Sequence, residues 1–305
     1  MTNLNSPVFQ NETKARKWLE ARVWPDGPIC PHCGDTENHT KLKGKEHREG
    51  LYQCNACRQQ FTVTVGTLFE RSKIPLHIWL KATYLLMSSK KGMSTRQLSR
   101  MLGVSVKSTW FMMHRIREAL RDNPELAGPL GGPNKVVEAD ETYVGGKAKN
   151  RAYREPPKKE AVFSLVERDG RVRSFHIPSV SAKTLRPILV TQIDRKSYLM
   201  TDEAGAYIKA GREFAGHGSV THSINEYVRG KFWHTNTVEN YFSILRRGVN
   251  GVYQHVSQQH LKRYLGEFDF RYNTRDVDDF ARTAMAVAGI SGKRMTYRRP
   301  SVGAN

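Results

Sequence analysis

Hydrophobic positions between residues 75 and 120 recur every three or four residues, which predicts helices. Three are expected, over residues 75–89, 94–102 and 105–120. In the second, Ser94 is in the position of an N-cap, with Gln97 three residues later, and a turn at Gly103 follows. A short helix, a glycine turn and a longer helix predict a helix-turn-helix.

After residue 135 the pattern becomes that of strands alternating with helices. Strands are expected over residues 136–144, 160–167, 171–178, 197–202 and 219–222, and helices over residues 181–192, 205–214, 237–249 and 258–272. Three antiparallel strands followed by helix, strand, helix and strand is the order of the ribonuclease-H-like α/β fold. A mixed sheet flanked by helices on both faces is therefore predicted.

The four cysteines form two C-x2-C pairs with twenty residues between them. The pairs are Cys30 with Cys33 and Cys54 with Cys57. This spacing is typical of a closed, structural four-cysteine Zn2+ site. With a hairpin over residues 40–53 and a strand over residues 61–65, it predicts a zinc ribbon. Two disulfides or four free thiols are the alternatives; disulfides need an oxidising compartment, and no export signal is present.

Composition marks the domain boundaries. Prolines and glycines concentrate just after residue 121 and predict a linker. The expected organisation is an N-terminal helix and zinc ribbon at 1–70, a helix-turn-helix at 71–122, a linker at 123–134, a ribonuclease-H-like catalytic domain at 135–290 and a basic tail at 291–305.

The charge balance indicates the class of partner. The chain has 49 Lys and Arg against 29 Asp and Glu, a formal net charge of +20. Such a field favours a polyanion, with nucleic acid ahead of an anionic membrane surface, since no basic amphipathic helix or lipidation signal is evident. Without a signal peptide or apolar span, we expect a cytoplasmic, nucleoid-associated protein that does not enter a membrane.

The third helix of the helix-turn-helix is the expected DNA-reading element. Its apolar stripe is predicted to be buried and comprises Val106, Trp110, Met113, Ile116 and Leu120. The positions off this stripe are expected to face DNA, and they are Lys107, Ser108, Phe111, His114 and Arg115. An ordinary helical hairpin packed on a larger domain is the alternative.

Three acids in the second half occupy elements that can converge at one edge of the sheet. Asp140 lies in the first strand, Asp202 ends the fourth, and Glu239 lies near the start of a helix. Such oxygen ligands suit Mg2+ or Mn2+, and two such ions can catalyse transfer at phosphate. Spaced acids also arise by chance, but their placement on these elements favours a site. Glu141 is expected to point to the other face, because neighbouring strand residues alternate.

The sequence resembles bacterial insertion-sequence transposases of the DDE superfamily, of the ISXO type. The resemblance rests on the cysteine pairs and on residues 139–146, 201–207, 234–242, 251–255 and 271–273. It implies an enzyme that binds the ends of an insertion element, cleaves DNA strands and joins the 3′-ends to target DNA. It also implies two catalytic Mg2+ or Mn2+ ions and a homo-oligomer assembled on DNA.

The resemblance also implies residue roles. Asp140 and Asp202 would be metal ligands, with Glu239 as the third and Asn236 as the alternative. The family usually has a basic residue, often Lys, seven positions after the glutamate; here it is Arg246, which with Arg247 is expected to bind DNA.

Two other functions remain open from the residues. One is a DNA-binding regulator with an inactive catalytic domain, which the intact set of acids disfavours. The other is a nuclease of the same fold that cuts DNA without joining it.

Overall fold

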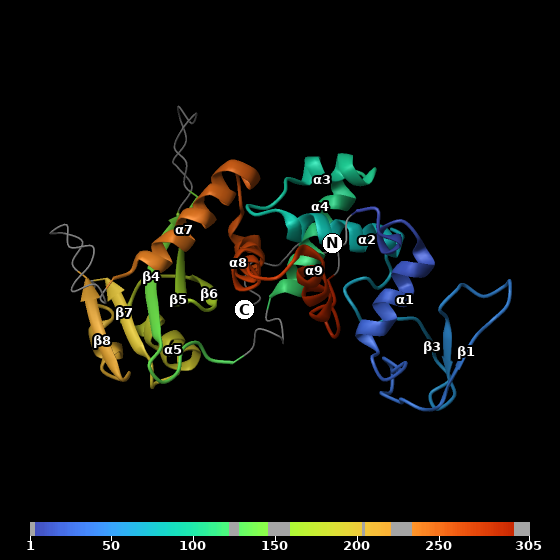
Figure 1. Ribbon diagram of the computed structural model, residues 1–305, viewed down its shortest axis with the longest axis horizontal. Helices are drawn as coiled ribbons and strands as arrows, with labels where there is room; N and C mark the ends of the chain where they lie inside the picture. The colour runs from blue at the N-terminus through green and yellow to red at the C-terminus, as the bar shows by residue number, and fades with distance from the viewer. Residues whose placement is uncertain (1–3, 122–127, 146–158, 203–204, 221–233, 296–305) are drawn as a thin grey trace. The chain divides into compact units, whose positions relative to one another are not determined.

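The computed structural model describes residues 4–121, 128–145, 159–202, 205–220 and 234–295 (Figure 1). These residues form two compact units. The first combines both ends of the chain, up to residue 121 and from residue 276, and the second spans residues 128–275. Within the described ranges, no helix is long and apolar enough to cross a membrane.

The second unit is built on a five-stranded sheet in the order β6-β5-β4-β7-β8. The strands are β4 (Val136–Val144), β5 (Glu160–Glu167), β6 (Val172–Ile177), β7 (Tyr198–Asp202) and β8 (Gly216–Val220). The first three pair antiparallel, whereas β7 runs parallel to β4 and β8 runs parallel to β7. This is the mixed sheet predicted for a ribonuclease-H-like fold.

Helices cover both faces of this sheet. On one face, Val137 and Ala139 of β4 join a core with α5 (Ala182–Gln192) and α6 (Ile208–Gly211). On the other, Val144 joins a core with α7 and α8. Here α7 spans Asn236–Gly248, continues as the π-helical turn η4 (Val249–Tyr253) and is followed by α8 (Gln258–Asn273). The apolar residues Val238, Phe242, Leu245 and Val249, at helical spacing along α7 and into η4, all lie in this second core.

Two predictions for this unit need correction. The helix expected over residues 205–214 is only the four-residue α6, which ends at Gly211. A Cβ at Gly211 would lie 2.3 Å from the His217 ring, so packing requires glycine there at the expense of helix propensity. The predicted linker is partly inside the fold, because Leu130 is fully buried and its N–H donates to Gln192 O at 2.8 Å.

The first unit combines a small antiparallel sheet with helices. The strands are β1 (His39–Lys41), β2 (Tyr52–Cys54) and β3 (Gln60–Phe61). The helices are η1 (Pro7–Phe9), α1 (Glu12–Val23), α2 (Leu76–Ser88), α3 (Thr95–Leu102), α4 (Val106–Leu120) and α9 (Asp279–Ala288). The strand expected over residues 61–65 is wrong after Phe61, because a turn follows in which Val65 N–H donates to Thr62 O at 3.0 Å.

The helix-turn-helix has the predicted local geometry. Ser94 is the N-cap of α3, and its hydroxyl accepts the Gln97 N–H at 3.2 Å. Gly103 ends α3 at φ +66°, in the left-handed region that favours glycine. Ser105 then caps α4, accepting the Ser108 N–H at 3.3 Å.

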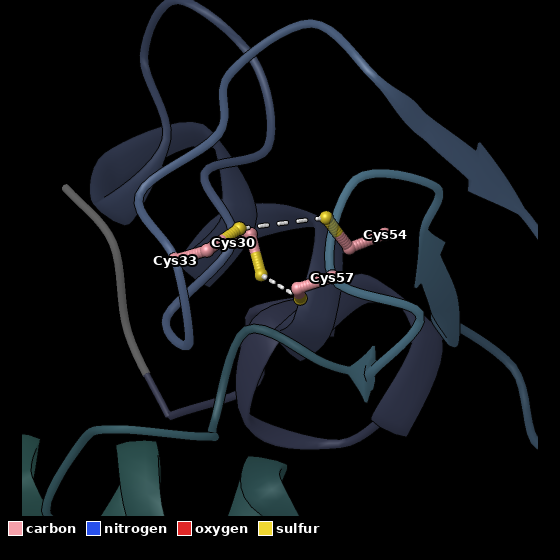
Figure 2. Close-up of side chains that lie close together, drawn as sticks. All are labelled: Cys30, Cys33, Cys54 and Cys57. Carbon is pink, nitrogen blue, oxygen red and sulfur yellow. Dashed lines mark hydrogen bonds between the residues drawn. The ribbon is translucent and has the colours of Figure 1, made fainter.

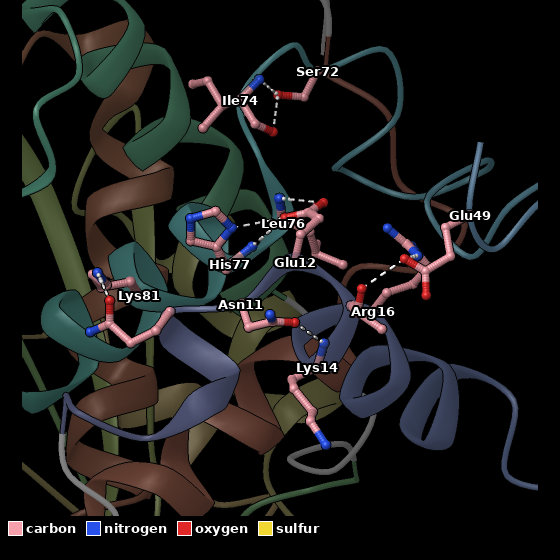
Figure 3. Close-up of polar contacts among 12 residues, drawn as sticks. Asn11, Glu12, Lys14, Arg16, Glu49, Ser72, Ile74, Leu76, His77 and Lys81 are labelled. Atoms are coloured by element: carbon pink, nitrogen blue, oxygen red, sulfur yellow. Dashed lines mark hydrogen bonds and ion pairs between the residues drawn. The ribbon is translucent and has the colours of Figure 1, made fainter. Parts of the chain in front are cut away.

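A carboxylate from α1 caps α2 across a long stretch of sequence (Figure 3). Glu12 accepts the N–H groups of Leu76 at 3.0 Å and His77 at 3.2 Å, and contacts His77 Nδ1 at 2.9 Å. Burial raises the pKa of Glu12, but the hydrogen bonds from His77 and from both amides outweigh it and hold the pKa below its usual value. Pro75, the N-cap residue of α2, has no side chain that can cap the helix, so the Glu12 carboxylate takes this role. The contact ties α1 to the helix-turn-helix.

The C-terminal helix α9 belongs to the first unit, whereas the sequence assigned residues 135–290 to the catalytic domain. Thr283, Ala286 and Val287 are buried, and Arg282 donates to Met87 O of α2 at 3.1 Å. The start of the predicted basic tail also docks, since Lys293 Nζ donates to Glu118 O at the end of α4 at 3.1 Å. The apolar face of α9 is covered by α2 and α4, a pairing that local sequence does not specify.

Ala286→Asp is expected to destabilise the first unit by about 3 kcal/mol or more, because it buries an unpaired carboxylate. Hydrogen exchange measured by mass spectrometry should show lost protection in α1–α4 and none lost in the sheet of the second unit. Ala288→Asp is the matched control on the exposed side of the same helix, expected to cost less than about 1 kcal/mol. Lost protection in β4–β8 alone would assign α9 to the catalytic unit instead.

Candidate metal centres and catalytic site

The four cysteines converge in the first unit (Figure 2). The Sγ atoms of Cys30 and Cys57 lie 3.7 Å apart, as do those of Cys33 and Cys54. All four Sγ atoms lie within 4.8 Å of one another, and no disulfide joins them. A tetrahedral ion with Zn–S bonds of about 2.3 Å needs such a spacing, so this donor set fits Zn2+.

The two cysteine pairs adopt the same backbone conformation. Cys30 N–H donates to Asp35 O at 2.9 Å, and Cys54 N–H donates to Gln59 O at 3.0 Å, five residues on in each case. The residue after each pair is left-handed, Gly34 at φ +81° and Arg58 at φ +61°. These equivalent turns present two thiols each to one point, which the spacing in the sequence predicted.

The two aspartates occupy equivalent places on adjacent parallel strands. Pairing between β4 and β7 ends at Glu138 and Met200. Asp140 and Asp202 each follow two residues later, on the same side of the sheet as those partners, where the strands separate. Carboxylate oxygens of Asp140, Asp202 and Glu141 lie within 4.8 Å of one another. The predicted convergence of the two aspartates is therefore present in the structure.

Glu141 reaches this cluster from the opposite face of β4. Its carboxylate accepts the hydroxyl of Tyr207, which belongs to the core beneath α5 and α6. Strand alternation predicted that the side chain of Glu141 points to the other face of β4 from Asp140, and the contact with Tyr207 agrees with this. It did not predict that the Glu141 carboxylate also lies close to the two aspartates. The signal in the sequence was the pair of consecutive acids. Where two neighbouring strands separate, both carboxylates of such a pair can come close to the same point.

The surroundings of Asp140 oppose its negative charge. Burial, together with the charges of Glu141, Asp202 and Glu239, raises the pKa of Asp140 to about 7, against a hydrogen bond from the Glu141 N–H. Burial likewise raises the pKa of Glu141, against the hydrogen bond from Tyr207. A bound cation would reverse this balance, so the oxygen donors fit a hard divalent ion such as Mg2+ or Mn2+.

Helix α7 brings its polar residues to the same face of the sheet. Glu239 lies in its first turn and accepts the Thr235 hydroxyl at 3.3 Å, while Asn236 is its first residue. Both are exposed, and neither belongs to the cluster of carboxylates within 4.8 Å that the described residues form. The structure thus brings the charge of Glu239 close enough to act on Asp140, without joining it to the cluster.

The two predicted arginines of α7 have different surroundings. Arg246 donates through Nη2 and Nε to the Thr142 hydroxyl at 2.7 and 3.1 Å. Thr142 is two residues from Asp140 and therefore on the same face of β4. Arg247 is exposed and donates to Ser243 O of its own helix at 3.1 Å.

Glu138, which was not among the predicted site residues, is fully buried on the face of β4 that carries Asp140. It accepts hydrogen bonds from Arg168, Thr237 and Val238. The available signal was its position two residues before Asp140, which places both side chains on one face of the strand.

The residues predicted to face DNA divide into two groups. Lys107 and Ser108 are exposed in the first turn of α4. His114 and Arg115 are buried, which contradicts the prediction for both. Arg115 donates to Glu70 O at 3.1 Å and to Met295 O, because the C-terminal segment covers this side of the helix.

The predicted apolar stripe of α4 also needs correction. Val106, predicted to be buried, is 49% exposed, and Trp110 is only half-buried. Phe111, which was predicted to face DNA, is also half-buried. Met113, Ile116 and Leu120 are buried as predicted. The exposed residues of α4 are therefore those of its first turn, Val106, Lys107 and Ser108, since the later turns are buried or half-buried.

Comparison with known families identifies two domains. Residues 129–273 match the ISXO2-like transposase domain, and residues 10–60 match the transposase zinc-ribbon domain. The chain is 29% identical over 284 residues to an uncharacterized protein in transposable element ISH50 of Halobacterium salinarum, covering 87% of this chain and 92% of that protein. This relative is archaeal, so the resemblance extends beyond bacterial elements.

Among solved structures, the crystal structure of the mariner Mos1 paired end complex with Mg aligns over 94% of each chain, at 12% identity and a TM-score of 0.25. The assignment rests instead on the two domain matches, on the strand order of the second unit and on the acids gathered where β4 and β7 separate. The chain therefore belongs to the IS1595 family of transposases, with a zinc ribbon and a DDE catalytic domain, and is a metal-dependent DNA transposase.

Proposed function

We propose that the protein binds the ends of its insertion element, cleaves DNA strands there and joins the 3′-ends to target DNA. The observation that carries the proposal is the convergence of Asp140 and Asp202 beyond the last paired residues of β4 and β7. We further propose that it works as a homo-oligomer on DNA, because joining two ends in one event requires more than one active site.

Asp140, Asp202 and Glu239 are the proposed ligands of two Mg2+ or Mn2+ ions, with Asn236 as the alternative third ligand. When bound, such ions would activate an attacking oxygen and stabilise a leaving oxygen at phosphorus. The protein's part is to hold the carboxylates at a fixed spacing on rigid strands. Since Asp140 retains a proton up to a pH of about 7 in their absence, binding the ions would release protons.

Arg246 is proposed to hold a DNA phosphate beside the carboxylates. Its guanidinium is oriented by the Thr142 hydroxyl, so it reaches the site from the face that carries Asp140. Arginine can bind a phosphate through two parallel hydrogen bonds, which a lysine cannot. Arg247 would add charge along the exposed side of α7.

The catalytic assignment predicts that each of three substitutions abolishes both nicking and joining: Asp140→Asn, Asp202→Asn and Glu239→Gln. Each change keeps the shape of the side chain but removes a ligand charge. A gel assay with end-labelled element DNA separates binding, cutting and joining, and end binding should survive in all three variants. Manganese is expected to rescue part of the activity, because it demands less of its ligands.

The same assay decides between the alternatives. If Glu239→Gln cuts and joins like wild type while Asn236→Ala is inactive, Asn236 is the third ligand. Wild-type protein that cuts without joining would be a nuclease. An active Asp140→Asn variant would refute the metal site and leave a DNA-binding regulator as the better description.

We propose that Cys30, Cys33, Cys54 and Cys57 bind one structural Zn2+, which would contribute on the order of 10 kcal/mol to folding the small ribbon. Purified, reduced protein is expected to contain one zinc per chain by elemental analysis. Cys54→Ser should release the ion and expose the ribbon to proteolysis, because Cys54 is fully buried at the centre of the site. Clearly substoichiometric zinc in freshly purified protein would refute the assignment.

Lys107 and Ser108 are proposed to contact the element ends from the first turn of α4. Lys107→Ala is expected to weaken end binding by about 1–3 kcal/mol if a base edge is lost. If a phosphate contact is lost, binding to all sequences should weaken alike and the salt dependence should flatten. Arg115→Ala is expected to lower the thermal stability of the first unit instead; unchanged affinity in Lys107→Ala would remove this turn from the interface.

A further inference from the structure

Glu138 connects the strand and the helix that carry the proposed metal ligands. It is fully buried in β4, two residues before Asp140 and on the same face. Its Oε2 accepts the N–H groups of Thr237 at 2.8 Å and Val238 at 3.0 Å, and its Oε1 accepts the Thr237 hydroxyl at 2.9 Å. One carboxylate thus accepts two backbone N–H groups and one hydroxyl from the first turn of α7.

Helix α7 depends on this carboxylate because it does not cap itself. Its N-cap residue, Thr235, makes no side-chain hydrogen bond to the helix N–H groups, although Thr is well suited to that role. The Thr235 hydroxyl donates instead to Glu239, the proposed third ligand. Glu138 therefore supplies the missing cap from another element, and the local capping residue is left to orient Glu239.

Arg168 completes the arrangement. Its Nε donates to Glu138 Oε1 at 2.6 Å, and its Nη2 donates to His234 O at 2.8 Å, just before the helix. Arg168 and Glu138 together hold the chain on both sides of Asn236. An ion pair between the fully buried Glu138 and the partly buried Arg168 adds little stability over a well-packed apolar pair, so its position beside the site calls for another explanation.

We infer that Glu138 is a positioning residue of the catalytic site: by binding the N-terminus of α7 to β4, it sets the spacing between Asp140 and the α7 ligand, Glu239 or Asn236. This inference rests on the proposed function, because it takes those residues as the metal ligands. Groups that orient metal ligands typically change metal affinity or activity by about 10–100-fold when they are replaced. Such groups usually contact the metal ligand directly, whereas Glu138 would act by holding the helix turn that carries the ligand.

The test compares two buried glutamates in the full-length, zinc-loaded protein. Glu138→Gln removes the charged cap, whereas Glu267→Gln makes the same change at a fully buried glutamate of α8 that binds Tyr253 and Arg271. Mn2+ binding is followed by the electron paramagnetic resonance signal of the free ion. Glu138→Gln is expected to weaken Mn2+ binding and to slow Mg2+-dependent cleavage by about 10–100-fold. Glu267→Gln should leave both unchanged, although both variants lower the melting temperature.

Thr237→Val covers the case in which Glu138→Gln does not fold. It removes one hydrogen bond to Glu138 and keeps the charge and its pairing with Arg168. It is expected to weaken Mn2+ binding in the same direction and less strongly. Equal Mn2+ affinity in wild type and Thr237→Val, or equal losses in Glu138→Gln and Glu267→Gln, would overturn the positioning role.

Asp140→Asn separates this inference from the proposed function. If Asp140→Asn binds Mn2+ as wild type does, the metal site itself is wrong. If Asp140→Asn loses Mn2+ while Glu138→Gln keeps it, the site is correct and only the role of Glu138 fails.

Discussion

The cost of placing several carboxylates on β4, around the point where its pairing with β7 ends, governs the rest of the second unit. Glu138, Asp140 and Glu141 follow closely on this strand, and Asp202 lies beside them. Each charge must be met by a partner or suppressed by protonation, since burial disfavours an isolated charge. How the fold treats each acid separates the structural carboxylates of β4 from Asp140, the proposed metal ligand on this strand.

Two of these acids have hydrogen-bond partners within the protein. Glu138 has Arg168 and the N-terminus of α7, and Glu141 has the Tyr207 hydroxyl. Asp140 accepts one backbone N–H, and the side chains that act on its pKa are acids that raise it. A strand that fully stabilised Asp140 would compete with a cation for its charge. The imbalance at Asp140 is therefore the expected preparation for metal binding.

Glutamates that cap distant helices recur in both units. Glu12 of α1 binds the start of α2, and Glu138 of β4 binds the start of α7. In each case the helix lacks a local capping side chain, so its N-terminal N–H groups are available to an acid from elsewhere. The helix N-terminus favours a negative charge, which makes the contact directional as well as attractive. Each glutamate thus ties together segments whose relation matters to the proposed catalytic site or to the proposed DNA-binding region.

The sequence alone determined the features that depend on local spacing. The cysteine turns, the cap at Ser94, the order of strands and helices and the meeting of Asp140 with Asp202 follow from residues close in sequence or from strand order. Burial on α4, the membership of α9 and the role of Glu138 did not follow, because each depends on which distant segment covers a given face. Arg115 lies at a position that the sequence predicts to face DNA, but it is buried and donates to Met295 O of the C-terminal segment. Periodicity shows that a face is distinct, but only the tertiary structure decides whether solvent, DNA or another part of the chain occupies it.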